Sequence, residues 1–268
     1  MNSNHFYNYA TLILTSLLLT LTGCSSKPWQ QTAIPEIDQA EYRSLISELI
    51  EQNKQCESKF DAETTISLTS GLQDRSIKGY LAVNLPNRVK FIVSTPLGQP
   101  LYIATVNDRK FQAIDVNNSI YHQGTVTDLV HHFDLPEILK KIDIGLILDN
   151  KLRTDFKFNH LPRQDKQKRG IWFSSNTQKK SEHILIDPAR KLIIEKIIED
   201  NDGNSLTINY SDYKQLGSCL QPNTIHISGL SYGAEIDIQL HDILSQPLQT
   251  SNDFTIKIPP GFIKQPLK

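Results

Sequence analysis

The stretch Ile77-Lys78-Gly79-Tyr80-Leu81-Ala82-Val83-Asn84, with Val89-Lys90-Phe91-Ile92-Val93-Ser94 a few residues later, decides the fold. Both halves are rich in Val, Ile and Tyr and alternate in polarity, which is the pattern of a β-strand. The connection contains Pro86-Asn87, which is typical of a tight turn. Because a parallel crossover takes roughly a dozen residues or more, a connection this short predicts an antiparallel hairpin.

The same pattern continues on both sides of this hairpin. It predicts further strands at 64–69, 101–106, 110–116, 119–123, 154–159, 170–175, 183–186, 191–199, 205–213, 223–228, 234–243 and 254–258. Sheets with so many strands rarely stay flat and open. The predicted fold is therefore α+β and mainly β, with a single strongly curved antiparallel sheet that forms an unclosed barrel.

Two helical regions are predicted beside this sheet. In the first, 38–54, Asp38 can cap the helix, and apolar residues recur every three or four positions, at Tyr42, Leu45, Ile46, Leu49 and Ile50. The second is an insertion with helices at 126–133 and 136–147, and Pro136 suits a first helical position. We expect both regions to cover the concave side of the sheet.

The N-terminus carries an export pattern. An apolar run from Ala10 to Leu21 precedes Thr22-Gly23-Cys24. It has the length of a signal-peptide core and is too short to span a bilayer as a helix. The alternative interpretation is an ordinary buried helix, but the polar, Pro-containing segment 25–28 follows at once. The small residues before the thiol resemble a bacterial lipobox. In bacterial lipoproteins an Asp directly after the lipidated Cys favours the inner membrane. Ser25 stands at that position here, which resembles the sequence of outer-membrane lipoproteins.

This resemblance implies three segments. Residues 1–23 are a lipoprotein signal peptide, residues 24–37 a lipidated tether that has no fixed shape from Trp29 to Ile37, and residues 38–268 the folded domain. Cys24 becomes the first residue of the mature protein and carries diacylglyceryl and N-acyl chains. Several acyl chains suffice for stable anchoring.

Charge and motifs exclude several function classes. Residues 1–23 contain no charged side chain, so the net charge of −1 belongs to the remainder, and near neutrality argues against nucleic acid as a partner. His131, His132 and Asp134 come nearest to a metal cluster, but adjacent histidines on a helix point apart. No G-x-S-x-G or phosphate-binding motif occurs. We expect no enzyme, no metal and no cofactor beyond the acyl chains on Cys24.

Two further features each fit two interpretations. With Cys24 acylated, Cys56 and Cys219 remain, and they are either a disulfide of an exported protein or two separate buried thiols. A basic cluster in a loop either contacts anionic headgroups or is a solvated hairpin tip; it consists of Arg163, Lys166, Lys168 and Arg169.

Apolar residues in several predicted strands share one face of the sheet. These residues are Val89, Phe91, Val93, Ile225, Ile227, Ile236, Ile238 and Leu240. They form an ordinary core or, because only two modest helices are available to cover them, the wall of a cavity for acyl chains.

The order of elements resembles the LolA/LolB-like superfamily of periplasmic lipoprotein carriers and outer-membrane receptors. The resemblance lies in Gly79–Val83 with Val89–Gly98, in Tyr210–Tyr213 with Leu220–Ile227, and in the chain from Asp242 to Pro259-Pro260-Gly261. It implies a monomeric lipoprotein on the periplasmic face of the outer membrane that binds acyl chains of lipoproteins or other lipids. A periplasmic LolA-like carrier is the implied partner.

In LolB-like proteins the Leu of a Pro-Leu-Gly loop protrudes and helps to deliver lipoproteins into the membrane. That position corresponds to Leu97, between Pro96 and Gly98. The alternative function is a structural or interaction lipoprotein of the envelope, whose core is filled and whose surface docks a partner protein.

Overall fold

The structure is a computed structural model of the 268-residue chain. It describes residues 27–30, 34, 36–71, 74–132, 135, 137–140, 144–154, 156–158, 160–177, 180–246 and 248–267, without the side chains of 36–39. The predictions for the signal peptide, Cys24 and Asp134 concern residues outside these ranges.

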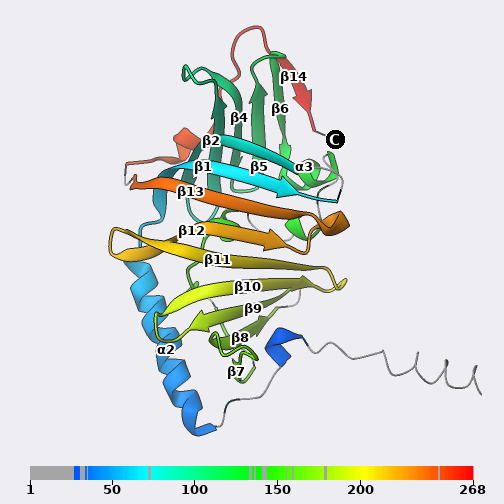
Figure 1. Cartoon of the computed structure of the whole chain (residues 1–268). Helices are drawn as coiled ribbons and strands as arrows, with labels where there is room; N and C mark the ends of the chain where they lie inside the picture. The colour runs from blue at the N-terminus through cyan, green and yellow to red at the C-terminus, as the bar shows by residue number, and fades with distance from the viewer. Residues whose placement is uncertain are drawn as a thin grey trace, which may run out of the picture.

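The described strands form one 14-stranded sheet in the order β14-β6-β5-β4-β3-β2-β1-β13-β12-β11-β10-β9-β8-β7. Their bounds are β1 Lys59–Thr69, β2 Asp74–Asn84, β3 Arg88–Ser94, β4 Pro100–Asn107, β5 Lys110–Asp115, β6 Ile120–Thr125, β7 Arg163–Gln164, β8 Ile171–Asn176, β9 Lys180–Asp187, β10 Leu192–Asp200, β11 Ser205–Leu216, β12 Cys219–Ser228, β13 Glu235–Ser245 and β14 Ile263–Pro266. The sheet does not close into a barrel. It is strongly curved, and β4–β6 run steeply across the direction of β10–β12 (Figure 1).

Helices and short helical turns flank the sheet. They are η1 Pro28–Gln30, α2 Glu36–Lys54, α3 Val126–His132, η2 Glu137–Lys140, α4 Gly145–Leu148, η3 Ser231–Gly233 and η4 Ser251–Phe254. The predicted amphipathic stripe of α2 is buried, with Leu45, Ile46 and Leu49 packed in the main hydrophobic core. Residues of the insertion join the same core through Ile138 and Ile147. We call the sheet face that packs against α2 and this insertion the inner face.

The strand register makes the inner face continuous from one strand to the next. Val83 pairs with Val89, and Ile66 pairs with Ile238, which in turn pairs with Ile225. Directly opposed side chains of an antiparallel pair lie on the same face. The register thus confirms that the apolar positions predicted from alternation share one face.

Three predicted elements differ in the structure. Residues Pro136–Ile147 are not one helix, because η2 and α4 are separate short helices. No strand occurs among the described residues of 154–159, where Phe156 and Phe158 pack against the core without joining the ladder. Alternating aromatic residues satisfied the strand pattern there, but they bury their rings from a loop.

The C-terminal segment is the third difference. In place of a strand at 254–258, η4 ends at the fully buried Phe254, and the backbone N–H of Ile256 donates to Gln112 Oε1 at 3.0 Å. The chain from 251 to 262 thus crosses the outer face of β3–β6. Strand β14 then pairs parallel to β6, so the sheet is not entirely antiparallel. The chain between these two strands runs from residue 126 to 262 and is far longer than the crossover that a parallel pair requires.

Candidate functional site

One half of the inner face is filled. Over β10–β13, the predicted cavity residues Ile225, Ile227, Ile238 and Leu240 are buried in the main core together with α2 and the insertion. Among the described residues this half is close-packed, and these four side chains act as core.

Polar side chains fix the insertion on this filled half. Three consecutive carbonyls at the end of α4 each accept a hydrogen bond from a different strand. Tyr210 Oη donates to Ile147 O at 3.1 Å, and Gln221 Nε2 donates to Leu148 O at 3.4 Å. Lys196 Nζ donates to Asp149 O. The last carbonyls of a helix have no partner within the helix, so this set, the "carbonyl clamp", satisfies them.

Lys196 is the least expected member of the clamp. It lies in the apolar strand β10, is buried, and its ammonium is 5.7 Å from the centroid of the Tyr210 ring. Burial lowers the pKa of Lys196, and Asp149 acts in the opposite direction. A buried ammonium is costly unless it is hydrogen-bonded. The hydrogen bond from Lys196 Nζ to Asp149 O therefore offsets part of the cost of burying Lys196.

The other half of the inner face is open. Toward the ends of β1, β2, β3 and β13, the inner-face side chains are only half-buried or exposed, and Ile77 is 49% exposed. The half-buried residues here are Ile66, Leu68, Phe91, Val93 and Ile236. Ile66, Phe91 and Ile236 contact the edge of the main core, as does the half-buried Val89 at the other end of β3. We call Ile66, Leu68, Ile77, Phe91, Val93 and Ile236 the apolar floor.

A glycine shapes the apolar floor. A Cβ at Gly79 would stand 2.7 Å from the Phe91 ring and 2.5 Å from Ile92 O. Only a residue without a side chain lets the ring lie across β2 at this distance. The sequence signal was visible as a glycine inside a strand pattern, but its packing partner was not.

The predicted loop residue Leu97 lies beyond the end of β3 and is 89% exposed. The turn is closed by hydrogen bonds from Thr95 N to Gln99 O at 2.8 Å and from Gly98 N to Thr95 O at 2.9 Å. Gly98 has φ +81°, which favours glycine. The turn therefore holds the Leu97 side chain out from the protein.

A polar cavity of about 330 Å³ lies on the outer face over β8–β10. Trp29 of η1 lines this cavity, and its ring stacks on the His183 ring with the two centroids 4.1 Å apart. Beside it, Lys27 Nζ pairs with Glu199 at 2.6 Å. Residues 27–30 are thus held against the sheet, although the tether was predicted to have no fixed shape from Trp29 onward. Trp29 reads as part of a polar linker in sequence, so nothing marked this contact.

His183 is buried in this cavity and its pKa is lowered to about 4. Burial is the main cause, and Lys27 and His160 add to it, while Glu199 acts in the opposite direction. Nδ1 lies 2.7 Å from Ser174 Oγ, and Nε2 lies 3.5 Å from Glu199 Oε2. The ring is therefore neutral near pH 7, which suits its stacking under Trp29.

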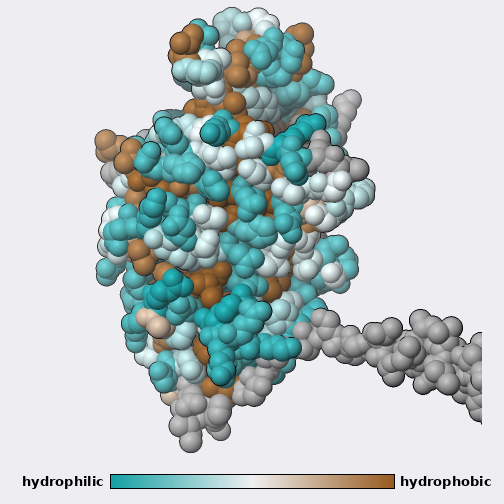
Figure 2. Space-filling view, viewed as in Figure 1, coloured by the Kyte–Doolittle hydropathy of each residue, from teal (hydrophilic) through white to brown (hydrophobic). Residues whose placement is uncertain are grey.

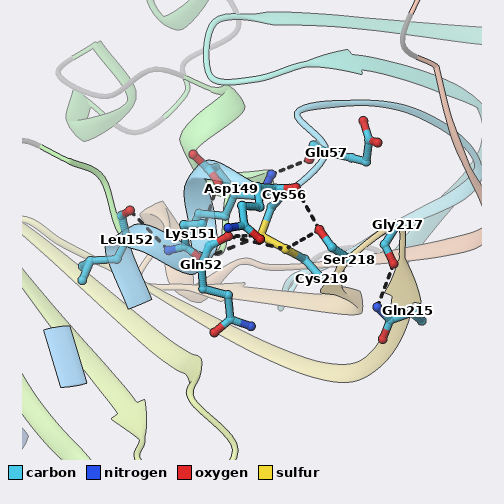
Figure 3. Close-up of a disulfide and its surroundings, with 12 residues drawn as sticks. Gln52, Cys56, Glu57, Asp149, Lys151, Leu152, Gln215, Gly217, Ser218 and Cys219 are labelled. Carbon is cyan, nitrogen blue, oxygen red and sulfur yellow. Dashed lines mark hydrogen bonds between the residues drawn. A yellow bond between two sulfur atoms is a disulfide. The ribbon is translucent and has the colours of Figure 1, made fainter. Parts of the chain in front are cut away.

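Cys56 and Cys219 are joined by a disulfide, with their Cα atoms 5.3 Å apart (Figure 3). It ties the end of α2 to the turn between β11 and β12. Ser218 Oγ donates to Gln55 O at 2.8 Å beside it, and Lys151 Nζ donates to Glu57 O. Of the two interpretations that the sequence left open, the disulfide is the one present.

The basic cluster is divided. Arg169 pairs with Asp165 at 3.0 Å and with Glu195 at 2.7 Å, and Trp172 Nε1 also donates to Asp165. Burial raises the pKa of Asp165, but the hydrogen bonds from Arg169 and Trp172 outweigh it and lower the pKa overall. Lys166 and Lys168 are exposed. The cluster is therefore a folded turn fixed by Arg169.

Two kinds of site were sought in the described part of the chain, a membrane-spanning helix and a metal cluster. No described helix is long and apolar enough to cross a membrane. No group of three or more metal-ligating side chains occurs among the described residues, and Lys140 Nζ approaches the His131 ring at 2.9 Å.

The sequence matches no protein-family model and no curated protein. Solved structures do resemble it in fold. A LolA superfamily protein from Nitrosomonas europaea superposes with a TM-score of 0.52 at 9% identity, over 79% of this chain and 97% of that one. A domain from Vibrio parahaemolyticus described as outer membrane lipoprotein-sorting gives 0.53 at 13%, over 78% and 94%. A DUF1329 family protein from Desulfovibrio piger gives 0.55 at 8%, over 80% and 96%.

Proposed function

We propose that this chain, which has the fold of the LolA superfamily protein described above, is an envelope lipoprotein that shelters acyl chains and passes them to the outer membrane. It would be anchored through acylated Cys24 on the periplasmic face and would receive lipoproteins or other lipids, with a LolA-like carrier as a donor. Leu97 would enter the receiving membrane. The mechanism needs no covalent chemistry, cofactor or metal.

The apolar floor is the observation that supports this proposal. Its side chains lie on the inner face of a sheet with an open end, and Ile77 is half-exposed there. Each methylene that leaves water contributes about 0.8 kcal/mol, without directional bonds. An acyl chain held in this way is retained against water and released to a bilayer.

Neighbouring residues of β3 provide a matched test. Val93 belongs to the apolar floor, whereas Ile92 is half-buried on the outer face and pairs with Tyr80. Because a buried unpaired carboxylate is strongly disfavoured, Val93→Glu should weaken binding of a fluorescent fatty acid by about tenfold or more. Ile92→Glu should leave the affinity nearly unchanged.

The second candidate function is an interaction module with a filled core. The burial of Ile225 and Leu240 under α2 and the insertion favours it. A well-folded protein that binds no fatty acid, or that loses binding equally in both variants, would contradict the acyl-chain proposal and support this second candidate.

A further inference from the structure

The chain leading into β14 contains an apolar loop between two lysines. Its sequence is Lys257-Ile258-Pro259-Pro260-Gly261-Phe262-Ile263-Lys264, and we call it the C-terminal loop. The side chains at its two ends are solvent-accessible, with Ile258 43% and Ile263 67% exposed. Six uncharged residues bracketed by ammonium groups suit a surface that is apolar inside and anionic outside.

The C-terminal loop is held in one shape. At its base Phe262 packs against a cluster on the outer face, and Ile263 N donates to Ser119 O at 2.9 Å. Phe262 N also donates to Pro259 O at 3.3 Å, closing the turn. Two prolines and this hydrogen bond restrict the backbone before any partner arrives, so binding orders little additional chain.

The tip of the loop projects into open space. Gly261 has φ +83°, and a Cβ placed on it would meet no described atom within 4 Å. Gly98, beside Leu97, has φ +81° and is open in the same way. Both turns thus present apolar residues from a glycine-containing tip.

The strand register places both tips at the same end of the sheet. Ile263 pairs with Ile120, Ile120 with Asp115, Asp115 with Tyr102, and Tyr102 with Val93. This row crosses four strand spacings, about 19 Å, and Leu97 lies just beyond its far end. Figure 1 shows the β3–β4 hairpin and the chain before β14 at the top of the molecule, and Figure 2 shows hydrophobic residues around these tips.

Two exposed lysines bracket the apolar loop at this edge, where the carboxylate of Asp115 accepts hydrogen bonds from Asn118. Lys257 and Lys264 are exposed, and within the described part of the chain neither ammonium pairs with a carboxylate. Lysines at the ends of an apolar segment place their stems along the hydrocarbon and their ammonium groups among lipid phosphates.

We propose that the C-terminal loop is a second membrane-contacting segment, which inserts Ile258 and Ile263 into an anionic phospholipid bilayer beside Leu97. This inference goes beyond the proposed function, because it requires neither an acyl-chain site nor transfer. The partner of the C-terminal loop is the bilayer itself. The flanking lysines and the rigid apolar tip lie along one edge of the sheet and do not line a groove.

The test uses the full chain extracted from membranes and reconstituted into phosphatidylethanolamine–phosphatidylglycerol vesicles. A fluorophore is placed through Ile263→Cys and quenched by nitroxide-labelled phospholipids. The matched control is Leu248→Cys, because Leu248 is 89% exposed and lies near the start of β1, at the opposite end of the β2–β3 hairpin from Leu97. The parent chain should take up no label, since Cys56 and Cys219 are joined and the acyl chain proposed on Cys24 occupies its thiol.

The label at residue 263 should be quenched at least about twofold more than the label at 248. Reversing both charges, with Lys257→Glu and Lys264→Glu, should reduce the quenching at 263 by about twofold or more, because anionic lipid then repels the loop. Equal quenching at 263 and 248 would overturn the proposal. Fatty-acid binding measured on the same samples reports separately on the proposed function.

Discussion

At the scale of single residues, the outer-face cavity links the N-terminal segment to one titratable ring. His183 is neutral in the folded protein because burial lowers its pKa to about 4. Trp29 covers the ring and Lys27 pairs with Glu199 beside it. Protonation of His183 would place a second cation close to Lys27 in a buried site.

Folded-state stability should therefore fall with acidification. The unfolded chain binds a proton at this position near pH 6.5 and the folded chain only near pH 4, so stability is lost as the pH falls between these values. Solvent in the cavity screens part of the effect, and we expect a loss of about 1–2 kcal/mol by pH 4.5. Urea unfolding at a series of pH values measures it.

His183→Gln provides the control for this prediction. Glutamine does not titrate in this range, so the dependence of unfolding free energy on pH between 4.5 and 6.5 should become shallower than in the parent protein. An identical slope in both proteins would show that other groups control the acid sensitivity.

Residue patterns also mark the limit of what the sequence predicts. Alternation placed Phe91 and Val93 on one face with Ile225 and Ile238, and the register confirms it, because strand periodicity is a local property. The contact of Trp29 with His183 joins segments that are distant in sequence. The contact of Gly79 with Phe91 depends on where the Phe91 ring is placed. Tertiary packing determines them, and no local pattern encodes it.

At the scale of elements, the insertion is held by polar bonds as well as by apolar packing. Strands β10, β11 and β12 each contribute one side chain of the carbonyl clamp, and Ile138 and Ile147 add apolar contacts. The sequence predicted helices in this region but not their breaks, and it gave no sign that Lys196 faces inward. A lysine in an apolar strand fits an outward position equally well.

Removing one bond of the clamp should destabilise the protein modestly. Tyr210→Phe leaves Ile147 O without its donor, which should lower the free energy of unfolding by about 1–3 kcal/mol. Denaturant titration measures the change. Tyr232→Phe is the matched control, because Tyr232 is exposed and should lose almost nothing. Equal losses in both variants would argue against a role for the clamp.

At the scale of the whole molecule, the Cys56–Cys219 disulfide joins residues 163 positions apart. It joins the end of α2 to the hairpin formed by β11 and β12. The chain between residues 56 and 219 is thereby closed into one covalent loop. The sequence supplied the two candidates, but not their proximity, because bridging depends on how the sheet curves.

Reduction should lower the stability of the entire fold. Opening a loop of this length should decrease the free energy of unfolding by about 2–4 kcal/mol, because the unfolded chain gains conformational freedom. Thermal unfolding with and without dithiothreitol measures the effect. The double variant Cys56→Ser, Cys219→Ser should unfold at the same temperature in both conditions, and a parent protein insensitive to reductant would contradict the prediction.

The docking of residues 27–30 on the outer face limits how the protein can be oriented on a membrane. Residues 27–30, which begin three positions after Cys24, are held on β9 and β10, whereas Leu97 projects beyond β3. Seven strand spacings separate β9 from β3 in the sheet order, about 34 Å along the sheet. A molecule that contacts lipid at both places must lie with its sheet along the bilayer surface. An orientation in which only the loops reach the bilayer would require Trp29 to leave its stacked position on His183.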